Sequence, residues 1–92
     1  MIIVRSERFK KQFRKLIKKD KRLIRKIEKT LHYLAQYPPP APALRMKAVK
    51  GTRGIYECSV DMDIRITFEF TEKNTLFLRN IDYHDEVFDK PW

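Results

Sequence analysis

The first third of the chain repeats its apolar residues with the period of an α-helix. Two stripes have this spacing, one made of Phe9, Phe13, Leu16 and Ile17 and the other of Leu23, Ile24, Ile27, Leu31 and Leu34. Ser6 and Asp20 precede the two stripes and belong to the residue types that cap helices. The prolines at 38–40 end the second stripe, because proline lacks the backbone N–H that a helix needs. The pattern predicts two helices with a very short connection, arranged as an antiparallel hairpin.

From residue 43 onward the period of the apolar residues changes to two, which is typical of strands. Together with the N-terminal β-branched run, strands are expected at 1–5, 44–49, 55–60, 64–70 and 75–81. The order β-α-α-β-β-β-β predicts an α+β fold, with an N-terminal strand and a two-helix hairpin packed on one face of a mainly antiparallel sheet of about four to five strands. No repeat or long linker divides the chain, so residues 1–92 are expected to form a single domain.

The register of the hairpin around residues 61–63 follows from which side chains share a face. A three-residue loop pairs Val60 with Ile64 and Ser59 with Arg65, and it keeps the apolar residues of both strands together. A two-residue loop would place Arg65 opposite Val60, on the apolar face. The three-residue loop gathers four polar side chains on the face away from the helices, namely Glu57, Ser59, Arg65 and Thr67.

The positive charge of the chain is concentrated in its helical part. The net charge is +9, but residues 1–30 carry +10 and residues 31–92 carry −1. This basic surface is either a solvated helix face or a contact with a polyanion. We prefer the polyanion contact, because the charge exceeds what solubility requires. A smaller basic cluster consists of Arg45, Lys47, Lys50 and Arg53. It is either a solvated strand edge or a contact with a nucleic-acid backbone.

The sequence argues against several kinds of site and location. A single cysteine, Cys58, allows no intrachain disulfide and falls on the predicted core face. Two distant histidines and one cysteine do not make a zinc site, and two glycines do not make a phosphate loop, so we expect no metal and no other cofactor. No signal peptide is visible, and no apolar run approaches the roughly 20 residues of a membrane helix. We therefore expect a cytoplasmic protein with no membrane partner.

Two residues of the near-neutral part are candidates for chemistry. His84 follows the last predicted strand, where it is either a surface loop residue or a general acid or base. Arg65 lies in the middle of an otherwise apolar strand and therefore needs a partner or a ligand. It either forms a salt bridge with Glu57 or Glu69 across the sheet or clamps a phosphate, for which guanidinium geometry is suited.

The order of elements and several short motifs resemble the RelE/YafQ group of bacterial toxins from type II toxin–antitoxin pairs. The resemblance covers essentially the whole chain. Its motifs are Val49-Lys50-Gly51, Tyr56-Glu57-Cys58, Asp63-Ile64-Arg65-Ile66 and His84-Asp85-Glu86-Val87-Phe88. Each motif is weak alone, and their order and spacing together are fairly specific for the superfamily. Members of the group cut mRNA in the ribosomal A site and are neutralised by a cognate antitoxin.

The resemblance implies roles for four residues of this chain. His84 and Phe88 match the YafQ-like ending, in which a histidine is a candidate acid or base and an aromatic residue four positions later stacks on a base or positions it. Asp63 matches an acidic residue in the YafQ-like hairpin turn. Arg65 matches the mid-strand arginine that RelE-like and YoeB-like members direct at the phosphate.

Other positions depart from both site designs. Lys47 falls where YafQ-like members carry a first histidine, Ser59 where they carry a second, and Ile64 where they carry a tryptophan. RelE-like members have lysines where this chain has Glu57 and Ser59. The chain thus mixes two designs and leaves the general base open, with Asp63 and Glu57 as candidates.

By resemblance, the expected function is that of a metal-independent endoribonuclease toxin that cuts mRNA on the ribosome and inhibits translation. Its catalytic residues would be His84, Arg65, Asp63 and Lys47, and its RNA-binding residues Lys50, Arg53, Arg45, Glu57 and Phe88. Two alternatives remain open, a ParE-like inhibitor of DNA gyrase that cuts no RNA and an inactive RNA-binding relative. The expected partners are the ribosome, mRNA and a cognate antitoxin, which would form a hetero-oligomer with the toxin through its basic surface.

Overall fold

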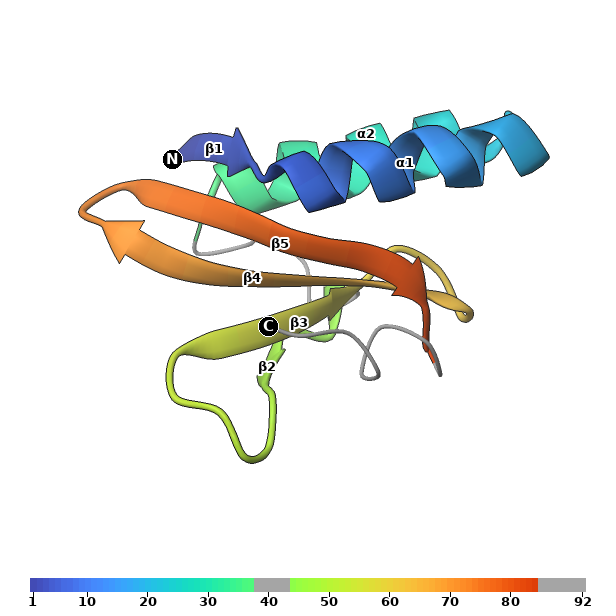
Figure 1. The fold of residues 1–92 in the computed structure, drawn as a ribbon. Helices are drawn as coiled ribbons and strands as arrows, with labels where there is room; N and C mark the ends of the chain where they lie inside the picture. Colours follow the sequence, from blue (N-terminus) through green and yellow to red (C-terminus); the bar gives the residue numbers. More distant parts are fainter. Residues whose placement is uncertain (38–43, 85–92) are drawn as a thin grey trace.

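The computed structural model describes residues 1–37 and 44–84 of the chain, which form two helices and five strands. In chain order these are β1 (Ile2–Arg5), α1 (Glu7–Lys19), α2 (Leu23–Ala35), β2 (Lys47–Ala48), β3 (Ile55–Ser59), β4 (Ile64–Glu72) and β5 (Thr75–Tyr83). Both helices lie over one face of a single sheet (Figure 1). The predicted α+β fold and its element order are confirmed.

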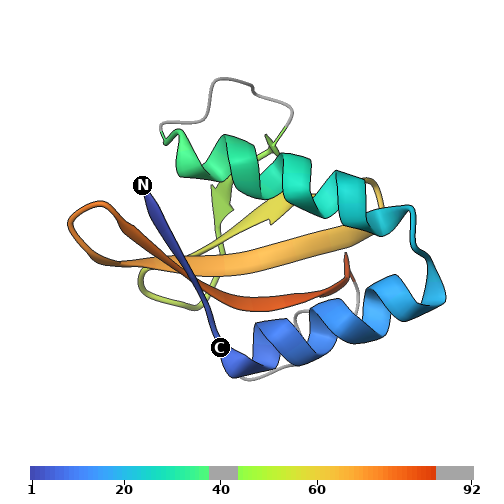
Figure 2. The same ribbon diagram turned by 90° about the horizontal axis from the view of Figure 1, so that it is seen from above.

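The two helices run antiparallel over the sheet, as the sequence predicts (Figure 2). Ser6 caps α1, because its Oγ accepts a hydrogen bond from the backbone N–H of Phe9 at 3.0 Å. The cap expected at Asp20 is wrong, since α2 begins only at Leu23 and its N-cap is Arg22. Asp20 instead closes the connection between the helices by accepting the backbone N–H of Arg22 at 3.0 Å.

The five strands form one sheet in the order β1-β5-β4-β3-β2. β1 runs parallel to β5, whereas the other three neighbouring pairs are antiparallel. Ser59 pairs with Arg65 and Glu57 with Thr67, which confirms the predicted three-residue loop. The backbone N–H of Val60 donates to the oxygen of Ile64 at 2.9 Å and closes this loop.

The strand expected at 44–49 is much shorter than predicted. Only Lys47–Ala48 pairs with β3, through Lys47 opposite Glu57 and Ala48 opposite Tyr56. Arg45 has a φ of 49°, a left-handed backbone conformation that interrupts an extended strand.

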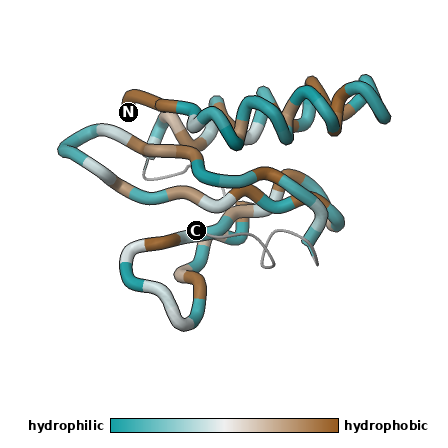
Figure 3. The backbone as a smooth tube through the Cα atoms, in the orientation of Figure 1, coloured by the Kyte–Doolittle hydropathy of each residue, from teal (hydrophilic) through white to brown (hydrophobic). Residues whose placement is uncertain are grey.

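The core lies between the helices and the sheet, and hydrophobic and hydrophilic positions alternate along both helices (Figure 3). Its largest members include Phe9 and Ile27 from the helices and Ile66 and Phe68 from β4, all fully buried. Cys58 is fully buried among them, as predicted, and burial raises the pKa of its thiol to about 12. None of the described helices combines the length and apolar character needed to cross a membrane.

Candidate active site at the β3–β4 turn

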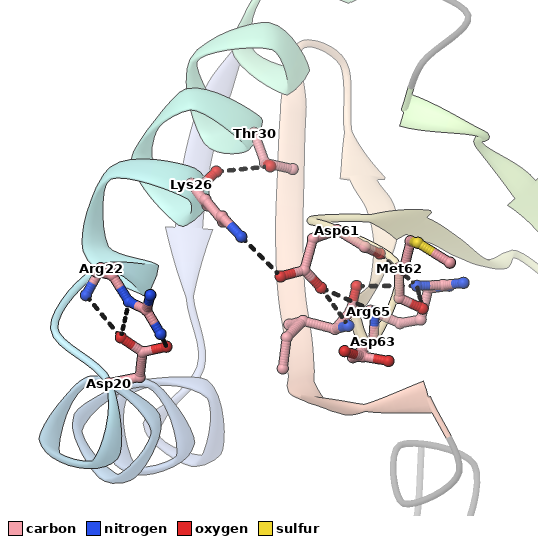
Figure 4. A network of polar contacts seen from close by, with 9 residues as sticks. Asp20, Arg22, Lys26, Thr30, Asp61, Met62, Asp63 and Arg65 are labelled. Atoms are coloured by element: carbon pink, nitrogen blue, oxygen red, sulfur yellow. Dashed lines mark hydrogen bonds and ion pairs between the residues drawn. The ribbon is translucent and has the colours of Figure 1, made fainter.

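The turn between β3 and β4 is built around the carboxylate of Asp61. Its Oδ1 accepts the backbone N–H groups of Asp63 at 2.9 Å and Ile64 at 2.8 Å. Its Oδ2 lies 3.4 Å from Nζ of Lys26 on α2 (Figure 4). A short acidic side chain that bonds the backbone two and three residues ahead is a common way to fix a tight turn. The helix layer therefore holds the turn from one side while Asp61 shapes it from within.

The electrostatic balance at Asp61 favours its charged form. Partial burial opposes ionisation, but the two backbone N–H groups of Asp63 and Ile64, together with Lys26, outweigh it and lower the pKa of Asp61 from its usual value of 3.8. Asp61 is thus a carboxylate occupied in holding the turn.

Arg65 folds back over the same turn. Its Nη1 donates to the backbone oxygen of Asp61 at 2.7 Å and to those of Met62 and Ile64, both at 3.2 Å (Figure 4). No partner is found for its Nε and Nη2 within residues 1–37 and 44–84. One nitrogen of Arg65 is therefore structural, whereas Nε and Nη2, which together carry three N–H donors, have no partner among these residues.

Neither salt bridge considered for Arg65 is found in the part of the chain that the structure describes. Glu57 lies 3.6 Å from Nζ of Lys47, and Glu69 lies 2.6 Å from Nη1 of Arg79. Both carboxylates thus have other cationic partners, while the turn supplies backbone oxygens to Arg65.

His84 lies next to the same turn, because the end of β5 pairs with the start of β4. Tyr83, the last residue of β5, pairs with Ile64. The backbone N–H of His84 then donates to the oxygen of Asp63 at 2.6 Å. Both side chains are exposed. The long β4–β5 pairing thereby joins residues that are 21 positions apart in the sequence, Asp63 and His84.

The remaining predicted site residues lie at different distances from this turn. Lys47 is exposed on β2, and its partner Glu57 is 4% exposed, so Glu57 is almost inaccessible to a ligand. Lys50 and Arg53 are exposed in the connection before β3. They therefore lie at the opposite end of β3 from the turn, about 16 Å away for a strand of this length. Phe88 lies outside the described residues.

A hollow of about 300 Å³ opens beside the turn. The described residues that line it are Arg45, Ser59, Val60, Asp61, Met62 and Arg65. Arg45 is the only member of the predicted basic cluster among them. The structure therefore divides that cluster, with Arg45 next to the turn and Lys50 and Arg53 away from it.

Two residues of this site were missed at the sequence level, Asp61 and Met62. The signal for Asp61 was present, because an Asp at the start of a short loop is a turn-forming residue. Met62 carries no such signal, because an apolar residue inside a short loop predicts nothing beyond the connection itself. No three His, Cys, Asp or Glu side chains of the described ranges are arranged to hold a metal ion.

The basic face predicted for the helices is present on their outer surface. The exposed members on α1 and α2 are Arg8, Lys11, Arg14, Lys15, Lys18, Lys19, Arg25, Lys26 and Lys29. The two helices carry only two acidic residues, Glu7 and Glu28, and their ion pairs include those from Lys10 to Glu7 at 3.4 Å and from Lys26 to Asp61 of the β3–β4 turn at 3.4 Å. This face therefore retains a strong positive potential.

A sequence profile of the family described as "ParE toxin of type II toxin-antitoxin system, parDE" matches residues 3–88. The chain belongs to this ParE toxin family. The match spans the helices, the sheet and the turn that carries the candidate site. No match is found for this ParE-family toxin among the curated proteins.

Solved toxins have the same fold as this ParE-family toxin. A metal-bound toxin from Helicobacter pylori is 29% identical, with a TM-score of 0.77 over 96% of this chain and 99% of that one. YafQ from E. coli strain BL21(DE3) is 19% identical, with a TM-score of 0.79 over 94% and 96%. The E. coli DinJ–YafQ complex contains a chain that is 20% identical, with a TM-score of 0.78 over 94% and 96%. The resemblance stated from the sequence is confirmed, and the fold is RelE-like.

We expect Asp61→Ala to lower the free energy of unfolding of this ParE-family toxin by about 1–2 kcal/mol near neutral pH, because two backbone N–H groups lose their acceptor. The pKa of Asp61 is lowered in the folded state, so its stabilisation is present above pH 3.8 and is lost as the pH falls through the lowered pKa. Urea unfolding at neutral and acidic pH measures this, with Asp63→Ala as the control. Equal stability of the two variants at neutral pH would contradict the role given to Asp61.

Proposed function

We propose that this toxin is a ribosome-dependent endonuclease that cuts mRNA by attack of a ribose 2′-OH on the adjacent phosphate. The observation that carries the proposal is the hydrogen bond from the His84 backbone N–H to the oxygen of Asp63. It joins the end of β5 to the turn over which the side chain of Arg65, at the start of β4, folds back. A histidine, a carboxylate and an arginine whose Nε and Nη2 have no partner among residues 1–37 and 44–84 are groups that such a reaction uses.

In this reaction a base takes the proton of the 2′-OH, and the bond between O2′ and phosphorus forms. The bond between phosphorus and O5′ then breaks, and an acid protonates O5′. The products are a 2′,3′-cyclic phosphate and a 5′-hydroxyl end. Negative charge builds up on the phosphate oxygens in between, where fixed cationic donors lower the barrier.

Each role is assigned to a residue of the turn region. His84 is the general acid or base, since imidazole transfers protons in either direction near neutral pH. Arg65 stabilises the phosphate through Nε and Nη2, and Lys47 adds positive charge from β2, on the other side of β3. Asp63 orients these groups or is the base itself. Glu57, buried against Lys47, is better suited to holding that lysine than to touching RNA.

The basic surfaces would hold the RNA and the ribosome. Arg45 lies beside the turn and would contact mRNA next to the cut, with Phe88 as an expected stacking residue. Lys50 and Arg53 would contact the RNA backbone farther away. The basic face of α1 and α2 would bind ribosomal RNA, because neutralised phosphates release their counterions.

A cognate antitoxin is the other proposed partner, with which this single-domain toxin would form a hetero-oligomer in the cytoplasm. The E. coli relative YafQ has been crystallised with its antitoxin DinJ. The net charge of +9 favours an acidic or amphipathic antitoxin segment on the helical face.

Inhibition of DNA gyrase is the second candidate, and the family description, which names ParE, favours it. The residues at the turn argue for the nuclease, since a non-cutting inhibitor has no use for a histidine, a carboxylate and an arginine around one turn.

Induction of the toxin in cells separates the two functions. We expect new mRNA 5′ ends at a fixed position within codons, growth arrest, and no DNA damage response before the arrest. DNA damage without new mRNA ends would support the gyrase inhibitor. If induction of the toxin left growth unaffected, the remaining alternative would be that the protein is an inactive RNA-binding relative.

A further inference from the structure

The side chain of Met62 is almost fully exposed to solvent, and its place in the β3–β4 turn does not explain this exposure. It is 90% exposed, more than any other large apolar side chain of residues 1–37 and 44–84. The turn needs no apolar residue at this point, because Asp61 and the backbone supply its hydrogen bonds. A fully solvated methionine next to a candidate active site is a surface for something to pack against. A thioether packs well on flat aromatic rings.

The hollow beside Met62 combines this apolar wall with positive charge. Arg45 and Arg65 line it together with Met62, and Ser59 adds a hydroxyl group. Two nitrogens of Arg65, Nε and Nη2, have no partner in the described chain. Asp61 also lines the hollow, but its carboxylate oxygens already accept from two backbone N–H groups and approach Lys26 at 3.4 Å. The net character of the hollow is therefore cationic with one apolar side.

Arg45 shows a second unusual feature. Its φ of 49° is a conformation that costs a non-glycine residue on the order of 1 kcal/mol and that glycine or asparagine adopts more easily. A long cationic side chain is thus held in a strained backbone position, at the edge of a hollow that contains a second arginine. Strain of this kind clusters at binding and catalytic sites.

The size of the hollow limits its ligand. Its volume of about 300 Å³ is at the lower end of the range for small-molecule pockets. It therefore fits one nucleotide unit rather than a longer segment. The base is the part that suits Met62, and the phosphate is the part that suits the two guanidinium groups.

We propose that the hollow between Arg45, Met62 and Arg65 is a subsite for a single nucleotide of the RNA, adjacent to the phosphate that is cut. The base packs on the Met62 side chain, and Arg45 binds the outer phosphate of that nucleotide. Met62 then influences which base is accepted beside the cut. The inference rests on the proposed endonuclease function and deepens it.

The test compares three variants by mapping the mRNA 5′ ends that each produces in cells. Met62→Ala is expected to change the base frequencies next to the cut by about three- to tenfold, the range of a sulfur–ring contact. Met62→Leu keeps an apolar wall and is expected to stay closer to the wild type. Ile2→Ala is the matched control, because it removes another exposed apolar side chain from β1 at the far edge of the sheet.

Arg45→Gly tests the cationic half of the subsite without weakening the fold. Glycine adopts the backbone conformation of Arg45 freely, so this variant is expected to unfold at an equal or higher urea concentration than the wild type. Its cleavage rate is expected to fall about tenfold, the effect of losing one charge-assisted contact. Lys73→Met, an exposed charge in the β4–β5 turn, is the control for loss of charge alone.

The outcomes separate the subsite from the function on which it depends. In one outcome the wild type cleaves mRNA, Met62→Ala leaves the base frequencies unchanged and Arg45→Gly leaves the cleavage rate unchanged. This outcome would overturn the subsite and leave the endonuclease function in place. Absence of cleavage by the wild type would overturn both. Altered base frequencies and a slower Arg45→Gly variant, with wild-type behaviour of the two controls, would support the subsite.

Discussion

Replacement of His84 by alanine is expected to reduce mRNA cleavage by about 10²- to 10⁴-fold, the usual loss when a general acid or base is removed. The fold is expected to survive, since His84 is exposed beyond the end of β5 and alanine keeps the backbone N–H that bonds Asp63. Single-turnover cleavage on programmed ribosomes measures the first effect, and urea unfolding measures the second.

His32→Ala is the matched control for His84→Ala. His32 is the other histidine of the chain, is exposed on α2 and does not line the hollow beside the turn. Its replacement is expected to leave the cleavage rate within about twofold, because it performs no proton transfer in the proposed chemistry. Cleavage by His84→Ala at the rate of His32→Ala would remove His84 from the mechanism.

Replacement of Arg65 is expected to have the second largest effect, a loss of about 10²- to 10³-fold in cleavage for Arg65→Met. Arg65→Lys restores only a small part of this rate, because an ammonium group cannot present two parallel donors to a phosphate. The loss should appear in the rate of the chemical step rather than in ribosome binding, since the charge on the phosphate develops in the transition state.

Arg65 also stabilises the turn, and its two contributions have to be separated. Its Nη1 donates to three backbone oxygens, so Arg65→Met should also lower the free energy of unfolding by about 1–2 kcal/mol. Asp61→Ala disturbs the same turn to a similar extent and leaves Nε and Nη2 of Arg65 in place. If Arg65→Met cleaved mRNA as fast as Asp61→Ala or faster, Arg65 would be only a structural residue.

Local patterns predicted most of the fold. The apolar stripes gave both helices, and the alternation around residues 61–63 gave the register of β3 and β4, because a one-residue slip would have moved Arg65 to the core face. The error at 44–49 has a local cause that alternation does not reveal, the left-handed backbone of Arg45. The error at Asp20 arose because a capping residue type does not fix where the helix begins.

The candidate site could be predicted only in part, because it depends on contacts between distant segments. The place of His84 after the last strand predicts a site residue, but its hydrogen bond to Asp63 follows from the length of the β4–β5 pairing. For Arg65, charge pairing across the sheet was a reasonable alternative, whereas its observed partners are the backbone oxygens of its own turn. Backbone acceptors have no sequence signature, and neither has the exposure of Met62.

The chemistry of the RNA ends that the purified toxin produces on ribosomes with a defined mRNA decides whether it is an endonuclease. We expect one cut in the A-site codon, with a 2′,3′-cyclic phosphate on the upstream fragment and a 5′-hydroxyl on the downstream one, and loss of both with His84→Ala. Intact mRNA, together with inhibition of DNA gyrase by the same preparation, would contradict this function.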